Sequence, residues 1–491
     1  MSTRSPLKRY FSNTATVIVA GSALALAGCS DSDDPVQVSQ NTFVRAFHAV
    51  PDAPPVDITF NGTTGVSALD FAENSGFARL SAGTYDIDVN AIVPGADPTV
   101  IDVDGLALAN RGRTTIFAVG TVDATDGADR DISELVVNEP VNEPASDEIS
   151  ISVVHAAPAA GAVDIYITAS GAVLAGATPI DADFKDSAEL AAPVAAAAAY
   201  QVRITADGDA STVVYDSGEL DLSGFAGQKI IVAAVNTTTQ SEQSAAPVKL
   251  VAINDTTQVE LLDTNTQAAA KVAHLSPDAA DAAGGDVEVF ANDAVELIPA
   301  FAYGDVVANT SDYALVDAGD YVFDVSPDND ANDDSVYTSG TLSLAAGSET
   351  TVLAVGYVAG SGDTAFELIT SADENRAYGT HARVKVIHAA AAVANVDVYV
   401  AAAGDFNSAN IVTAGPDALL SNFAYKGDSG YVDLAAGDYD IFVAAAGTDT
   451  IAIEALNVTV SAGNVLSIIA RGADESVGAA ITTAGLLVLS N

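Results

Sequence analysis

Histidine and aspartate recur at regular places in this chain, and they are residue types that can carry acid–base chemistry. Four similar segments each close on a histidine, and these histidines fall 107, 119 and 114 residues apart. An aspartate follows nine residues after three of them and twelve after the other, so a repeated His–Asp hydrogen bond is expected. The pairs are His48 with Asp57, His155 with Asp164, His274 with Asp286, and His388 with Asp397.

A catalytic role for these pairs lacks the other parts that such chemistry needs. No serine or cysteine recurs in register with them to act as a nucleophile, and a His–Asp pair alone is not a triad. His388 shares strand parity with Val384 and Val386, which is typical of a hydrogen-bonded structural histidine. No His-Glu-x-x-His, Gly-x-Ser-x-Gly or Walker motif is present. We therefore expect structural histidines, no catalytic residues, no enzymatic activity and no cofactor.

One acidic segment is the candidate for a metal site. Asp328, Asp330 and Asn332 resemble the first half of a calcium loop. Asp333 stands where such a loop has its central glycine, and Ser339 stands where it has its last glutamate. A hairpin loop is favoured, with calcium as the alternative. Five histidines scattered over separate units cannot assemble a zinc site within one fold.

The histidine segments mark a long repeat whose period suits a small domain rather than a solenoid unit. Alternating apolar residues such as Val56, Ile58 and Phe60 predict strands, and turn signals come about every ten residues. This pattern predicts antiparallel β-sandwiches.

A tyrosine follows a turn later in each unit, and the glycine turn before it resembles a tyrosine corner, in which the hydroxyl closes a buried backbone bond. In the second unit an alanine run from Ala195 to Ala199 replaces the glycine turn, and a helical turn from Ala188 is the alternative there. The four tyrosines are Tyr85, Tyr200, Tyr321 and Tyr439.

The predicted fold class is all-β, with four tandem Ig-like antiparallel β-sandwich domains after a lipoprotein signal peptide. Two Asn-Glu-Pro triplets within 138–148 and a polar stretch at 371–381 predict exposed linkers between separately folded units. The predicted segments are a signal peptide at 1–28, a lipidated tether at 29–42, and repeats at 43–138, 149–262, 268–371 and 381–491.

The N-terminal segment has the features of an export signal. Basic residues precede a short apolar run from Thr14 to Ala25, which is too short to span a bilayer comfortably. Leu26-Ala27-Gly28-Cys29 then matches the bacterial lipobox, so we expect Cys29 to be acylated and to anchor the protein to a membrane. Ser30, rather than aspartate, follows it, and by resemblance to enterobacterial sorting this favours the outer membrane or cell surface.

The charge balance excludes one class of partner. Lys and Arg number 18 against 66 Asp and Glu, a formal net charge of −48. Nucleic-acid binders need a basic face, so we expect no nucleic-acid partner. A solvated acidic surface suited to saline surroundings is favoured over a specific cation site.

Three motifs together resemble a known family. They are Val-x-Val-x-His near the start of a strand, Pro-x-x-x-Val-Asp-Val-Tyr, and Leu-x-Ala-Gly-x-Tyr. The combination resembles the domain of unknown function 4397, which occurs in secreted and lipid-anchored bacterial proteins, often in tandem. The resemblance covers nearly all of the chain after the tether and is weakest in the second unit. It implies an Ig-like surface module and no established activity.

These observations favour a non-enzymatic, lipid-anchored cell-envelope protein. We expect it to present four β-sandwich modules for adhesion to, or binding of, a protein or polysaccharide partner. The competing hypothesis is an envelope glycan hydrolase that uses loop carboxylates as an acid–base pair. The absence of tryptophan counts mildly against sugar stacking. A purely structural spacer is the third alternative.

Overall fold

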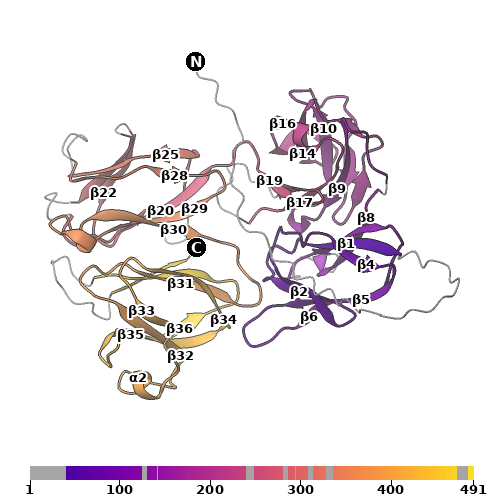
Figure 1. Cartoon of the computed structure of the whole chain (residues 1–491). Coiled ribbons are helices and arrows are strands. Elements are labelled where there is room, and N and C mark those ends of the chain that lie inside the picture. Colours follow the sequence, from indigo (N-terminus) through magenta and orange to yellow (C-terminus); the bar gives the residue numbers. More distant parts are fainter. Residues whose placement is uncertain are drawn as a thin grey trace, which may run out of the picture.

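The computed structural model describes residues 40–123, 130–140, 142–238, 248–279, 286–292, 295–307, 313–327, 335–472 and 485–490. The predicted signal peptide, Cys29, nearly all of the predicted tether and the calcium candidate Asp328, Asp330 and Asn332 lie outside these ranges. Within them the fold is all-β, with facing sheets, which confirms the predicted class (Figure 1).

The first unit is a sandwich of two four-stranded sheets. Its strands are β1 (Asn41–His48), β2 (Val56–Phe60), β3 (Thr63–Leu69), β4 (Ala78–Ser81), β5 (Gly83–Ala91), β6 (Thr99–Leu108), β7 (Arg113–Val119) and β8 (Ser133–Asn138). One sheet has the order β4-β1-β7-β8 and the other β3-β2-β5-β6. In β5, Ile87 and Val89 are buried and alternate with Asp86 and Asp88, as the period of two predicts.

The second unit has the same two layers. Its elements are β9 (Glu148–His155), η3 (Pro158–Ala160), β10 (Val163–Ala169), β11 (Ile180–Ala182), β12 (Ser187–Glu189), β13 (Val194–Ala195), β14 (Ala199–Ala206), β15 (Asp209–Asp216), β16 (Leu220–Asp221), η4 (Ser223–Phe225), β17 (Lys229–Asn236), β18 (Val248–Ile253) and β19 (Gln258–Leu261). The main sheet orders are β12-β9-β17-β18-β19 and β11-β10-β14-β15. The helical turn considered from Ala188 is wrong, because β12 and β13 there pair with β9 and leave that backbone extended.

The third unit repeats the arrangement with shorter strands. Its elements are β20 (Ala268–His274), β21 (Val287–Ala291), β22 (Val295–Phe301), β23 (Val306–Val307), β24 (Ala314–Val316), β25 (Gly319–Tyr321), β26 (Phe323–Pro327), β27 (Tyr337–Thr338), β28 (Leu342–Leu344), β29 (Glu349–Val355), η6 (Gly362–Thr364) and β30 (Glu367–Asp373). The sheets are β23-β20-β29-β30, with β24 also on β20, then β22-β21-β26-β27, and the pair β25-β28.

The fourth unit matches the first in its sheet pattern. Its elements are β31 (Ala382–His388), β32 (Val396–Ala402), α2 (Ile411–Ala414), β33 (Leu420–Phe423), β34 (Asp428–Leu434), β35 (Gly437–Ala445), β36 (Ile451–Val460), β37 (Val465–Ala470) and β38 (Leu486–Ser490). The sheets are β34-β31-β37-β38 and β33-β32-β35-β36.

The pairing is not antiparallel throughout, which corrects one detail of the prediction. In every unit the strand that ends in the repeated histidine runs parallel to a strand near the end of that unit. These parallel pairs are β1 with β7, β9 with β17, β20 with β29, and β31 with β37. We call the sheet that contains this parallel pair the histidine sheet of its unit.

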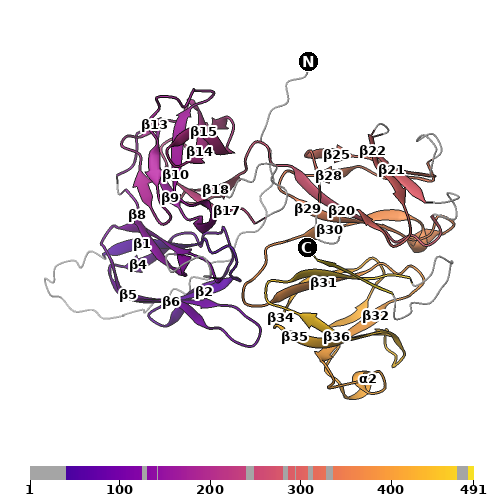
Figure 2. The ribbon, with the colours of Figure 1, turned by 180° about the vertical axis from the view of Figure 1, so that it is seen from behind.

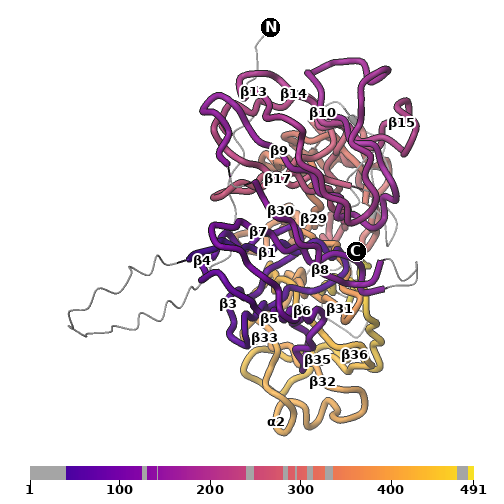
Figure 3. The backbone as a smooth tube through the Cα atoms, turned by 90° about the vertical axis from the view of Figure 1, so that its right-hand side faces the viewer, coloured from indigo at the N-terminus to yellow at the C-terminus, as the bar shows by residue number. Residues whose placement is uncertain are grey.

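Histidine sheets pack face to face, so the four units form two pairs. The sheet of the first unit lies against that of the second, and the third lies against the fourth (Figures 1 and 2). Viewed from the side, β9 and β17 lie over β1 and β7 (Figure 3). The first contact is one buried apolar cluster made of Phe47, Ala49, Phe71, Ala72, Phe117, Val119 and Val137 with Val154, Ala156, Ile231, Ala233, Val235, Val251 and Ile253.

The second pair is joined by a similar cluster. It consists of Ala273, Leu275, Leu353 and Val355 with Ile387, Ala389, Ile469 and Leu489. Histidine sheets are therefore buried on both faces: in β1, Val44 and Ala46 face the core of their own unit, while Phe47 faces the partner unit.

The expected exposed linkers are in part buried. Glu139 is 6% exposed, and Ser371 and Asp373 are 5% and 8% exposed, because their side chains enter the contacts between paired units. Separately folded units were predicted from these two linkers; whether the units fold singly or as pairs stays a prediction, and the face-to-face packing favours pairs.

Candidate functional site

The repeated histidines lie at the ends of β1, β9, β20 and β31, and each is at most 1% exposed. In every unit, the imidazole Nδ1 accepts a hydrogen bond from the main-chain N–H two residues later. The donors are Val50, Ala157, Ser276 and Ala390, at 3.2, 3.3, 3.3 and 3.3 Å. The ring therefore closes the turn that follows its strand.

The second ring nitrogen is engaged in three of the units. Nε2 lies 3.1, 2.6 and 3.1 Å from the main-chain carbonyl oxygens of Pro54, Gly161 and Ala394, six residues after each histidine. A carbonyl oxygen only accepts, so Nε2 carries the proton and donates. Residue 280, at the same spacing after His274, lies outside the described residues. Within them, Nε2 of His274 has no hydrogen-bond partner.

Burial keeps these imidazoles neutral. It lowers the pKa of His48 and of His274 to about 4, and it lowers the pKa of His155 and of His388 below the ordinary value of 6.5. A neutral, buried ring with both nitrogens bonded to the backbone offers no lone pair to a substrate proton. The geometry at His48, His155 and His388 thus suits holding a turn rather than general base catalysis.

An aromatic ring packs edge-on against each histidine. The rings are Phe71, Phe184, Tyr303 and Tyr425, with centroids 6.4, 6.3, 6.3 and 5.9 Å from the imidazoles. The residue after each aromatic has a positive φ and donates its N–H to the carbonyl of the histidine; these residues are Ala72, Lys185, Gly304 and Lys426.

Sequence reasoning missed this aromatic partner. The aromatics follow their histidines by 23 to 37 residues, and the residue at the left-handed position is alanine, lysine or glycine. The spacing differs between the units, and no glycine recurs at this position in all four. The sequence therefore contains no fixed motif that links each aromatic to its histidine. Phe301-Ala-Tyr303-Gly and Phe423-Ala-Tyr425-Lys, which share an aromatic-Ala-Tyr pattern, are the signal that could have found it.

The predicted His–Asp hydrogen bond is wrong. The histidine ends a strand of one sheet, whereas in the first, second and fourth units the aspartate lies in the opposite sheet of the sandwich. Asp57 accepts from the N–H of Ala68 at 2.8 Å, and Asp164 accepts from the N–H of Gly208 at 3.1 Å. Asp397 accepts from Asn422 at 2.7 Å and from Gly447 at 2.9 Å.

Two of these aspartates hold irregular backbone. Ala68 and Asn422 have φ values of 50° and 52° at shifts in strand register, and each donates its N–H to the repeated aspartate. The carboxylate thus satisfies a donor that the bulge removes from the sheet. In the third unit the strand position equivalent to that of Asp57 holds Glu288. Asp286 lies just before β21 begins.

The repeated tyrosines make the corner hydrogen bond in three units. The hydroxyls of Tyr85, Tyr321 and Tyr439 donate to the main-chain carbonyls of Ser81, Asp317 and Ala435, four residues earlier, at 2.9, 2.6 and 2.9 Å. These bonds lie at the surface rather than in the core. Across the described chain, Tyr200 has no equivalent bond, and its turn is the one in which alanines replace glycine.

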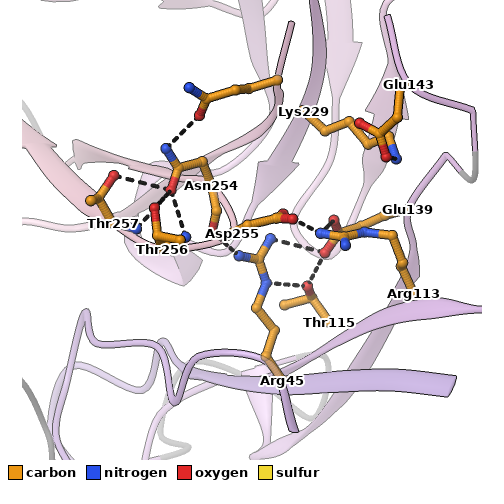
Figure 4. A network of polar contacts seen from close by, with 11 residues as sticks. Arg45, Arg113, Thr115, Glu139, Glu143, Lys229, Asn254, Asp255, Thr256 and Thr257 are labelled. Atoms are coloured by element: carbon orange, nitrogen blue, oxygen red, sulfur yellow. Dashed lines mark hydrogen bonds and ion pairs between the residues drawn. The ribbon is translucent and has the colours of Figure 1, made fainter. Parts of the chain in front are cut away.

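A buried charged network spans the contact of the first pair (Figure 4). Arg45 on β1 donates from Nη2 to Glu139 at 2.9 Å and from Nε to the hydroxyl of Thr115 at 2.8 Å. Thr115 in turn donates to Glu139 at 2.6 Å. Arg45 also reaches across the contact to the main-chain carbonyl of Asn254 at 2.5 Å. Arg113 adds a second cation beside Glu139.

The second pair has a cation, a threonine and a carboxylate at the equivalent positions, with different residue types. Lys271 replaces Arg45, three residues before the histidine, and its register partner is Thr351, as that of Arg45 is Thr115. Thr351 donates to Asp373 at 2.7 Å, and Lys271 donates across the contact to the carbonyl of Ser490 at 2.6 Å. We call each set of cation, threonine and carboxylate a clamp.

The second clamp recruits a further cation from the fourth unit. Lys385, 1% exposed, forms an ion pair with Asp373, whose side chain is fully buried. Tyr313 donates to the same carboxylate at 2.8 Å, and its pKa is raised by burial. A fully desolvated carboxylate needs these partners, since an unpaired buried charge is strongly unfavourable.

The segment between the third and fourth units touches the first unit as well. Arg376 donates to the carbonyl of Ala53 at 2.5 Å and forms an ion pair with Asp70. Gly379 donates its N–H to the carbonyl of Asp52 at 2.7 Å. This segment, predicted as an exposed linker, thus joins the two pairs.

The described residues contain neither a cluster of metal-binding side chains nor a membrane-spanning helix. Over the described ranges, no group of three or more His, Cys, Asp or Glu side chains is placed to hold a metal ion. Every helix in that part of the chain is too short or too polar to cross a bilayer.

Comparison with known proteins gives one family match. A model described as "Domain of unknown function (DUF4397)" matches residues 42–166 and 272–399. Each match covers nearly all of one unit and runs on to the strand that carries Asp164 or Asp397 in the next, so it spans the contact within a pair. A search of curated proteins finds no match.

Solved structures resemble the chain only distantly. "The Bacillus anthracis TIE protein" is 9% identical, covers 88% of this chain and 68% of its own, and has a TM-score of 0.14. "Product complex of a multi-modular glycogen-degrading pneumococcal virulence factor SpuA" is 9% identical, covers 59% and 37%, and has a TM-score of 0.15. Neither similarity supports a statement about function.

Proposed function

Because this chain belongs to the family described as "Domain of unknown function (DUF4397)", we propose a non-enzymatic function as a scaffold for binding at the cell envelope. In this proposal a lipid on Cys29 anchors the protein, and two rigid pairs of β-sandwiches present their loops and outer sheets to a protein or polysaccharide. The faces of the histidine sheets that pack between paired units are interior surfaces and take no part in binding that partner.

The observation that supports this proposal most is the clamp in each pair. Arg45, Thr115 and Glu139 recur as Lys271, Thr351 and Asp373, and both cations donate to a main-chain carbonyl of the partner unit. Buried charges of this kind hold units in one relative orientation. A rigid array is what an envelope protein needs to hold its binding surfaces at a defined distance from the membrane.

The engaged histidines give further support for a non-enzymatic function. An acid–base enzyme needs a titratable group that reaches substrate with a pKa near the working pH. The repeated histidines do not meet this requirement. The imidazoles of His48, His155 and His388 are buried, both of their nitrogens are hydrogen-bonded to the backbone, and burial lowers their pKa. Their hydrogen bonds to the backbone stabilise the turn that follows each strand.

The lipid anchor rests on the sequence from Leu26 to Cys29. In a Cys29→Ala protein we expect loss of the lipid and release from the membrane fraction, because the acyl chains supply the membrane affinity. Mass spectrometry of the N-terminal peptide measures the modification. Normal cleavage and undiminished membrane association of Cys29→Ala would contradict the anchor and leave the binding proposal standing.

The binding role is tested with the chain from Ser30 onward. Purified envelope polysaccharides and envelope proteins are presented to it, and both retention and the formation of new reducing ends are measured. We expect saturable retention without new reducing ends. Release of new reducing ends in proportion to the amount of protein would overturn the non-enzymatic assignment and support the glycan hydrolase. Absence of retention on every envelope component would favour the spacer.

A further inference from the structure

A cavity lies between the two sheets of the third unit. Its volume is about 190 Å³, whereas the corresponding spaces in the fourth and first units are about 40 and 20 Å³. Nearly all of its lining is aliphatic or aromatic; Val272, Val289, Phe301, Phe323 and Val352 contribute. Protein interiors are normally packed closely enough to leave no such space, so this void sets the third unit apart.

The sequence accounts for the void at one pair of positions. Ala270 on β20 faces Ala314 on β24, and both line the cavity. In the fourth unit the corresponding residues, Val384 and Val432, face each other across β31 and β34. Methyl groups thus replace isopropyl groups on adjoining strands, and the space that the branched side chains fill in the fourth unit is empty in the third.

Two residues of the lining lie on edge strands and are partly exposed. Leu297 on β22 and Leu315 on β24 both line the cavity, yet they are 39% and 41% exposed. These strands belong to opposite sheets of the sandwich, and β22 lies in the layer opposite β20 in Figure 1. Each sheet thus contributes one leucine that contacts both the cavity and the solvent.

One nitrogen in the lining has an incomplete set of hydrogen bonds. His274 is 1% exposed and lines the cavity, and within the described residues its Nε2 has no partner. With Nδ1 accepting from Ser276, Nε2 carries the proton and can donate to an oxygen. Among the described side chains of the lining, the one other polar group is the hydroxyl of Tyr321, which donates to the main-chain carbonyl of Asp317.

We propose that the third unit binds a small apolar alcohol, a hydrocarbon chain or ring of about six to eight carbons with a hydroxyl end, between its sheets. A dry apolar cavity of about 150 Å³ holds a benzene molecule, so a space of about 190 Å³ suits a ligand of this size. The hydroxyl oxygen accepts from His274. A carboxylate would enter without a cation to pair with it, so the neutral alcohol binds in preference to the acid of equal length.

The test uses 1-hexanol and the full chain, with binding measured by calorimetry. We expect one saturable site, and binding weakened by at least about tenfold in Ala270→Val/Ala314→Val, which restores the residues of the fourth unit. Ala107→Val, at an exposed strand position in the first unit, is the matched control and should bind as the parent does. Hexanoate should bind at least about tenfold more weakly than hexanol.

A second measurement covers the case in which the filled variant does not fold. In the parent protein, NMR contacts between the hexanol protons and the methyls of Ala270 and Ala314 should appear and saturate with the calorimetric signal. The absence of saturable binding to the parent overturns the proposal. So does hexanol binding that survives filling of the cavity, or contacts that map to other alanines.

Discussion

Lys271 donates a hydrogen bond from its ammonium to the main-chain carbonyl of Ser490 at 2.6 Å, although 219 residues separate them. Lys271 lies in the first strand of the third unit, and Ser490 ends the last strand of the fourth. Arg45 makes the equivalent bond to Asn254, the residue that follows β18. In each pair a buried cation on the first strand of one unit thus bonds to a main-chain carbonyl of the partner unit, and this relationship leads to the first prediction.

Removal of the carboxylate from a clamp should destabilise its pair strongly. Glu139→Ala leaves Arg45 buried without its counter-charge, and breaking a buried pair in this way costs about 3–5 kcal/mol. Urea unfolding of the fragment 40–262 measures the change in the free energy of unfolding. The control is Glu219→Ala, which removes an exposed carboxylate and should cost less than about 1 kcal/mol.

The double variant Arg45→Met/Glu139→Leu separates charge from packing. Because it removes both charges, it should recover most of the stability lost in Glu139→Ala. Equal losses in Glu139→Ala and Glu219→Ala would show that the clamp contributes no more than an exposed carboxylate.

The units should fold as pairs rather than singly. A fragment of residues 40–140 exposes Phe47, Phe117 and Val119, which are buried against the second unit in the full chain. Burial of side chains of this kind contributes about 1.5–3 kcal/mol each, so the single unit should be much less stable than the fragment 40–262 and should bind a hydrophobic dye. Calorimetry should give one cooperative transition for the pair. Independent transitions, with the single unit as stable alone as in the pair, would restore the separately folded domains predicted from the sequence.

Stability should fall as the pH is lowered from about 6.5 to about 4. The folded state holds the pKa of His48 at about 4, whereas the unfolded chain takes up the proton near pH 6.5. Between these values the unfolded state binds more protons, so acid favours unfolding, by roughly 3 kcal/mol for His48 alone. The free energy of unfolding of the fragment 40–262 is measured across this range.

Replacement of the histidine isolates its share of that pH dependence. His48→Asn keeps a polar side chain but does not titrate, so its stability should change less between pH 6.5 and 4 than that of the parent. At neutral pH, His388→Ala should cost about 1–3 kcal/mol by leaving backbone groups unsatisfied. A parent-like pH profile in His48→Asn would mean that carboxylates alone cause the acid sensitivity.

Salt should stabilise the protein without a specific requirement for calcium. A formal net charge of −48 repels itself in the compact state, and at 0.15 M ionic strength the Debye length is about 8 Å, so salt screens neighbouring carboxylates. Sodium and potassium chloride should raise the melting temperature alike and gradually. Asp328 and Asp330 lie outside the described residues, so this prediction rests on the sequence. A saturable calcium shift at constant ionic strength that is lost in Asp328→Ala/Asp330→Ala would contradict it.

The sequence by itself determined the all-β class and the repeat, because both are written in local patterns. A period of two, as in Val56, Ile58 and Phe60, is enough to predict a half-buried strand. The turn before Tyr85, Tyr321 and Tyr439 is equally local, since each hydroxyl bonds a carbonyl only four residues away. Such features depend on neighbours in the chain and survive in any tertiary setting.

The tertiary structure alone decided which groups meet. His48 and Asp57 are nine residues apart, but they stand on opposite sheets, so the expected hydrogen bond does not form. Arg45 and Glu139 meet because β1 and β8 flank β7 in one sheet. The contact with Asn254 needs a second sheet packed on the first, and no local pattern encodes that choice. Its physical basis is the burial of apolar side chains such as Phe47 and Phe117, which is non-directional and becomes specific only when two complete faces come together.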